Sequence, residues 1–106
     1  MSTPIEKAIV WAKNNLHLNL NVYSMAEQVH MSPRNFHRRF TREVGSTPTK
    51  YVETIRLHKA KSHLELSEKS LEDIARETGF SSADRMRRSF IRSFNVSPSD
   101  YRERNR

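Results

Sequence analysis

Arginine is the residue type in this chain best suited to binding chemistry, and it is concentrated in two short segments. Thirteen of the 19 basic residues are arginine, and residues 33–45 and 82–94 each hold four of them against one acidic residue. Each segment thus carries +3, and together they hold most of the chain's net charge of +7. A guanidinium group can donate two parallel hydrogen bonds to a phosphate or to a guanine edge. The charge pattern therefore indicates a nucleic acid as the partner.

Both segments combine this charge with an apolar stripe at helical spacing. The stripes consist of Phe36, Phe40 and Val44 in one segment and Met86, Phe90 and Phe94 in the other. Residues at three- and four-residue steps share one face of a helix, so each stripe would be buried while the polar face stays exposed. Such a helix fits the major groove of B-DNA, where base edges present distinctive donors and acceptors.

The position along each helix separates base contacts from phosphate contacts, because residues near the N-terminal end of a groove-bound helix reach deepest toward the bases. We expect base contacts from Arg34, His37, Arg38, Arg85 and Arg88. We expect phosphate contacts from Arg39, Arg42, Arg87 and Arg92, and from the helix N-termini at Asn21 and Ser70. For His37, the alternative is an ordinary surface histidine.

The chain repeats itself, which explains why two such segments exist. Residues 36–52 read FHRRFTREVGSTPTKYV, and residues 86–102 read MRRSFIRSFNVSPSDYR. The offset is 50 residues here and 49 upstream, where Asn21 matches Ser70, so the second copy has one extra residue in its turn. Each copy predicts a short helix, a tight turn and an arginine-rich helix, which is the outline of a helix-turn-helix.

Cap residues divide the rest of the chain into helices, and no segment predicts a strand. We expect an all-α chain of seven helices, with one over about 4–16 and a longer one from Thr47-Pro48 to about Leu66. The others begin at Asn21, Ser32-Pro33, Ser70, Ser81 or Ser82, and Ser97-Pro98. The predicted organisation is a first helix-turn-helix subdomain over 1–46, a linker helix over 47–66 and a second subdomain over 67–106.

Composition excludes several other classes of protein. The chain has no cysteine and only two glycines, which rules out disulfide scaffolds, thiolate metal sites and glycine-rich phosphate loops. No set of residues predicts catalysis or a cofactor. His58 and His63 are five residues apart and do not share a helix face, so they do not predict a metal site. The sequence therefore predicts a protein that is not an enzyme and has no cofactor or metal.

Two motifs carry a resemblance to a known family. The segments MSPRNFHRRF and IARETGFSSADRMRRSFIRSFNVSPSDYR are similar to the DNA-binding domain of the AraC/XylS family of bacterial transcription regulators, and the match covers about residues 5–102. The stretches SPRNFHRRF and SSADRMRRSF resemble the branch that carries an N-terminal glutamine-amidotransferase-like domain, which we do not expect within these 106 residues. The resemblance implies two helix-turn-helix units joined by a long helix.

The family's base-reading positions fall on Arg34, His37, Arg38, Asp84, Arg85 and Arg88. Asp84 is unusual among them: its carboxylate could accept a hydrogen bond from cytosine, but phosphates would repel it. The alternatives for Asp84 are a helix cap, with Ser81 three residues before it, or a partner that orients an arginine.

The resemblance also implies a functional setting. We expect double-stranded DNA and RNA polymerase as partners, no membrane, a bacterial cytoplasmic location at the nucleoid, and a monomeric segment within a regulator that dimerises through another domain. The alternatives are a basic helical protein–protein adaptor and a module that binds nucleic acid without sequence preference.

Overall fold

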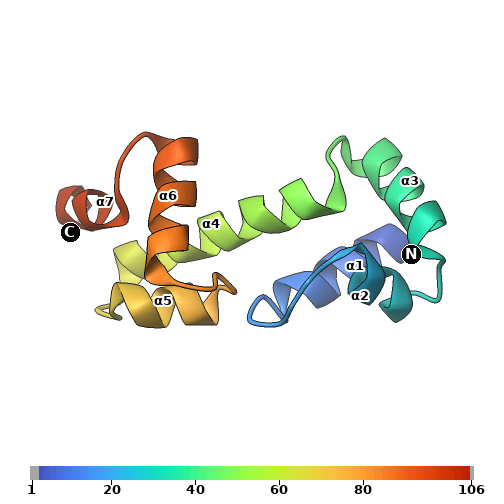
Figure 1. The fold of residues 1–106 in the computed structure, drawn as a ribbon, viewed down its shortest axis with the longest axis horizontal. Helices are drawn as coiled ribbons and strands as arrows, with labels where there is room; N and C mark the ends of the chain where they lie inside the picture. Colours follow the sequence, from blue (N-terminus) through green and yellow to red (C-terminus); the bar gives the residue numbers. More distant parts are fainter. Residues whose placement is uncertain (1–2, 106) are drawn as a thin grey trace. The chain divides into compact units, whose positions relative to one another are not determined.

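The computed structural model describes residues 3–105, which form seven helices and contain no strand. Figure 1 shows them in chain order. The helices are α1 (Pro4–Lys13), α2 (Val22–Gln28), α3 (Pro33–Val44), α4 (Pro48–Leu66), α5 (Leu71–Glu77), α6 (Ala83–Phe94) and α7 (Pro98–Arg104). The predicted all-α fold with seven helices is confirmed.

The chain divides into two compact units, residues 1–55 and 56–106, each with its own core. The boundary falls inside α4, which contributes Val52 to the core of the N-terminal unit and Leu57, Ala60 and Leu64 to that of the C-terminal unit. Among the described residues, no helix is long and apolar enough to span a membrane.

In the N-terminal unit, α1, α2 and α3 pack against one another around Phe36 and Phe40. Both rings are fully buried, with centroids 5.6 Å apart, and Tyr51 of α4 meets Phe40 edge-on at the same distance. Trp11 of α1 is half-buried and packs against this core. Buried rings thus fix α3 from behind and leave its other face exposed.

In the C-terminal unit, α6 stands across α5 (Figure 1) and packs on both α5 and α7. Phe90 is fully buried, and its ring lies 4.7 Å from that of Phe94 and 5.7 Å from that of Tyr101. Hydrogen bonds connect α7 to the end of α4. The Tyr101 hydroxyl donates to Glu65 (2.9 Å), and the Arg102 guanidinium donates to backbone oxygens of α4 and of the loop that follows it.

The two units repeat the same local structure, which confirms the internal duplication. α2 and α5 have seven residues each, and α3 and α6 have twelve. Residues 36–51 and 86–101 agree in burial at every position except Arg39 and Ser89, where Ser89 is the more buried. The turn before the second arginine-rich helix is one residue longer, as the change in offset predicts.

Each turn between the paired helices is a Schellman motif, in which backbone N–H groups beyond the helix satisfy its last carbonyls. Met31 donates to Ala26 (3.1 Å) in the first turn, and Phe80 donates to Ala75 (2.8 Å) in the second. This motif needs a positive φ at the residue that follows the helix cap, and His30 (57°) and Gly79 (88°) supply it. Histidine therefore takes the place of glycine in the first turn.

Most helix boundaries agree with the sequence, and one does not. Ser32 caps α3 and Ser82, rather than Ser81, caps α6. The first helix ends at Lys13, before the predicted residue 16, because Asn14 caps it and the side chain of Asn15 donates to the Trp11 carbonyl (2.8 Å). Leu16 is nevertheless buried, since the turn that follows α1 folds back onto the core.

Candidate nucleic-acid interface

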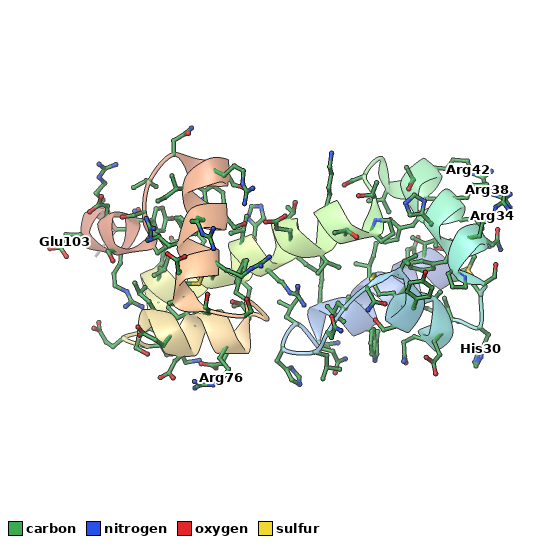
Figure 2. All side chains as sticks on the ribbon, viewed as in Figure 1. His30, Arg34, Arg38, Arg42, Arg76 and Glu103 are labelled. Carbon is green, nitrogen blue, oxygen red and sulfur yellow. The ribbon has the colours of Figure 1, made fainter. Side chains whose placement is uncertain are left out.

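The exposed face of α3 carries the basic residues of the N-terminal unit. Figure 2 shows Arg34, Arg38 and Arg42 following one another along one side of this helix, as their four-residue spacing dictates. All three are exposed, and so is His37. Arg34 and Arg42 form no ion pair with any described residue, so both guanidinium groups are available to an anionic partner.

Neighbouring side chains hold the other two arginines of α3. The amide oxygen of Asn35 accepts from Nη2 of Arg38 at 2.8 Å, and Glu43 accepts from Nε of Arg39 at 3.3 Å. The half-buried Arg39 therefore projects less freely than Arg38. This contact was not predicted, although Asn35 stands three residues before Arg38 and so shares its helix face.

The exposed face of α6 carries the matching set in the C-terminal unit. Arg85 and Arg92 are exposed and form no ion pair with any described residue. Arg87 and Arg88 are also exposed, and both contact Asp84, from Nη2 (3.2 Å) and Nε (3.1 Å) respectively. Ser82 provides the helix cap, so Asp84 acts as an arginine partner and forms no capping box with Ser81.

These ion pairs leave the interface positively charged. Exposed pairs contribute little free energy, because water and salt screen them. The side chains of Arg88 and Asp84 are 63% and 61% exposed, and those of Arg87 and Arg39 are 51% and 32% exposed. A phosphate or base can therefore compete for each arginine.

Asn21 and Ser70 occupy the equivalent N-cap positions of α2 and α5. Asn21 forms a full capping box with Ser24, and the Ser70 hydroxyl accepts from the Asp73 backbone at 3.1 Å. The first turn of α5 also contains Glu72 and Asp73. The pKa of Asp73 is lowered mainly by a hydrogen bond from Arg76 and secondly by the positive charge of that arginine, so this carboxylate stays ionised. The start of α2 is consequently the better of the two for an anion.

No group of three or more histidine or acidic side chains in residues 3–105 is placed to hold a metal ion. His58 instead lies edge-on to Phe94, at 6.0 Å between ring centroids.

Comparison with known proteins identifies this arrangement. Residues 25–104 match the family described as "Helix-turn-helix domain". The chain is 46% identical over 79 residues to an HTH-type transcriptional regulator of Mycobacterium tuberculosis, covering 74% of this chain and 30% of that protein. It is 37% identical over 95 residues to the transcriptional activator RhaS of Escherichia coli, covering 90% and 34%. The chain thus spans about a third of the length of these curated relatives.

Solved structures agree with this assignment. The DNA-binding domain of AdpA, determined in complex with a target DNA, superimposes with a TM-score of 0.91 at 35% identity, covering 97% of this chain and 93% of that one. An AraC-type regulator from Chromobacterium violaceum gives 0.88 at 27% identity, covering 96% and 91%. The duplicated motif, the two arginine-rich helices and these similarities lead to one conclusion: the chain belongs to the AraC/XylS-type family of helix-turn-helix DNA-binding domains.

Proposed function

We propose that this domain binds double-stranded DNA sequence-specifically and regulates bacterial transcription, with α3 and α6 reading successive major grooves. The observation that carries the proposal is the matched pair of exposed arginine rows, each on a twelve-residue helix whose opposite face is fixed by buried rings. A solvated charged surface would not need the same arrangement twice. The similar AdpA domain, solved with a target DNA, supports the same use of the fold.

In this proposal, the N-terminal halves of α3 and α6 contact base edges. The proposed base-contacting residues are Arg34, His37 and Arg38 on α3, and Arg85 and Arg88 on α6, where Asp84 contacts arginine side chains. Arginine is suited to guanine, because its parallel donors match the O6 and N7 acceptors. Arg34 and Asp84 occupy equivalent positions with opposite charge. The two half-sites should therefore differ in sequence, and the operator should be asymmetric.

Phosphate contacts would come from side chains farther along the same helices and from helix N-termini. The proposed side chains are Arg39, Arg42, Arg87 and Arg92, and the N-termini are those at Asn21 and Ser70. The capping side chains at these two N-termini already accept backbone hydrogen bonds. Phosphate would accordingly be bound there by N–H groups of the first helical turn.

The wider role follows from the relatives, which are about three times as long as this chain. We propose that the domain is part of a cytoplasmic regulator located at the nucleoid, that it contacts RNA polymerase, and that it catalyses no reaction. The domain itself would be monomeric, with dimerisation supplied by another part of a longer protein. RhaS is named as a transcriptional activator, which is consistent with such a role.

Equilibrium binding with a salt titration tests this function against its alternatives. The domain should bind a duplex far more tightly at low salt than at high salt, with log K falling by about 0.9 per phosphate contact for each unit of log salt concentration. An RNA duplex, an anionic vesicle and an acidic protein serve as comparison partners. Equal binding to all these polyanions, or no binding to DNA duplexes at low salt, would rule the proposal out.

Removing a phosphate-contacting arginine should weaken binding to all sequences alike. For Arg42→Ala or Arg92→Ala, we expect the salt slope on any duplex to fall by roughly 1, because one fewer phosphate is neutralised. Lys13→Ala on α1 and Arg104→Ala on α7 remove one exposed charge from the same units and serve as matched controls. A slope unchanged in the α3 and α6 variants, or reduced equally in the controls, would contradict these assignments.

A further inference from the structure

Asp84 is the acidic residue in the first turn of α6, at the N-terminal end of the arginine-rich face. Its two carboxylate oxygens have different partners: Oδ1 accepts a hydrogen bond from Nη2 of Arg87 at 3.2 Å, and Oδ2 forms an ion pair with Nε of Arg88 at 3.1 Å. Each arginine is bound through one nitrogen. For Arg88 the contacting atom is Nε, and none of residues 3–105 accepts a hydrogen bond from its two terminal amino groups, which can therefore donate to DNA.

The equivalent position of α3 shows that this arrangement is particular to one half of the domain. At the 50-residue offset, Arg34 stands where α6 has Asp84, and Arg38 stands where α6 has Arg88. Arg38 is held by the neutral amide of Asn35 at 2.8 Å, through Nη2 rather than Nε. Of Arg38 and Arg88, only Arg88 contacts a carboxylate, and it does so through Nε, which leaves its two terminal amino groups for DNA.

Stabilisation of the fold does not account for this network. Asp84, Arg87 and Arg88 have side chains that are 61%, 51% and 63% exposed, and exposed ion pairs contribute little to stability. A carboxylate among DNA-facing arginines also lowers attraction to phosphate. A protein that needed only to hold DNA would bind more tightly without Asp84.

We propose that Asp84 is a positioning residue that sets the sequence specificity of the C-terminal unit, an inference that rests on the proposed function. By holding Nε, Asp84 directs the terminal amino groups of Arg88 toward O6 and N7 of one guanine. Because Asp84 also contacts Arg87, it orders both guanidinium groups before DNA binds. Its negative charge penalises any register in which a phosphate takes the place of the guanine.

The Asp84→Ala variant should therefore be less selective for its preferred sequence, while its affinity for random DNA should not fall. We would compare three duplexes: one selected by the domain from a random pool, the same duplex with the guanine read by Arg88 changed to adenine, and a random sequence. That guanine is the position at which Arg88→Ala loses discrimination. A good bidentate contact discriminates by about 5- to 150-fold. For Asp84→Ala, we expect discrimination at this base to fall about 10-fold, with binding to the random duplex unchanged or a few-fold tighter.

Two further variants separate positioning from charge. Asp84→Asn keeps the size of the side chain and one acceptor oxygen, so it should retain part of the discrimination while raising affinity for random DNA. Asp100→Asn removes an exposed carboxylate from the first turn of α7, outside the arginine-rich face, and should leave discrimination intact. Circular dichroism melting checks that each variant is folded.

A double-mutant cycle identifies the route by which Asp84 acts. In an Arg88→Ala background, Asp84→Ala should have no further effect on discrimination at that base. An equal loss with and without Arg88 would show that Asp84 contacts the base itself and would overturn the positioning role. Unchanged or higher discrimination in Asp84→Ala would overturn it too. Failure of the parent domain to distinguish selected from random duplexes would instead refute the proposed function.

Discussion

Replacing Phe40 or Phe90 by alanine should lower the free energy of unfolding by about 3–5 kcal/mol, the range for a buried aromatic ring. Both rings are 0% exposed and lie at the centre of their own core. Phe40 packs against Phe36 and Tyr51, and Phe90 packs against Phe94 and Tyr101. Each substitution removes these contacts and leaves a cavity beneath an arginine-rich helix. Urea denaturation followed by circular dichroism measures the loss.

Tyr23→Ala is the matched control for this loss, because it removes an aromatic ring that is 69% exposed on α2. Its denaturation midpoint should stay close to that of the parent. If Phe40→Ala and Phe90→Ala unfolded at the parent midpoint, the rings would not support α3 and α6. A loss confined to one of the two variants would mean that only that unit depends on its ring.

Truncating either of the proposed base-reading arginines should cost about 1–3 kcal/mol of binding free energy on the selected duplex. It should also relax specificity within one box, meaning the short stretch of base pairs that one helix reads. Arg38→Ala acts on the box read by α3, and Arg88→Ala on the box read by α6. The reason is that each guanidinium supplies the paired donors that distinguish guanine. Equilibrium titration of each variant against duplexes with single-base changes in either box provides the measurement.

Arginine-to-lysine variants separate the charge of these groups from their shape. Arg38→Lys and Arg88→Lys keep the positive charge but lose the planar pair of donors. They should bind random duplexes like the parent and still lose discrimination at the affected box. An equal loss of affinity for selected and random duplexes in the alanine variants would show that these arginines contact phosphate rather than bases.

Local features of the structure could be predicted from the sequence, because side chains a few residues away create them. Ser32-Pro33 and Ser97-Pro98 mark the starts of α3 and α7, where the serine hydroxyls accept from backbone N–H groups three residues on. Asn95 takes a left-handed conformation (φ 58°) at the end of α6, where the first copy has Gly45 (φ 84°). The duplication predicts this, since asparagine tolerates positive φ better than most residues.

Contacts between distant residues could not be predicted from local patterns. Tyr101 reaches Glu65 across 36 residues, and Arg102 reaches the Leu64 carbonyl across 38. The amino group of Lys61 lies 4.9 Å from the centre of the Phe94 ring for the same reason: packing, rather than spacing, brings them together. The partners of the arginines could be predicted only in part. Asn35 and Asp84 stand at helical spacing from the arginines that they contact, but side-chain rotamers decide which of the possible contacts forms.

Selection of duplexes from a random pool by the purified domain is the most direct measurement of the central claim. If α3 and α6 each read one major groove, the selected duplexes should share two different short boxes whose centres lie about 10 bp apart. Box-specific loss of the consensus in Arg38→Ala and Arg88→Ala would connect each helix to its own box. Recovery of a single box, or of no common sequence despite tight binding, would contradict sequence reading by two helices.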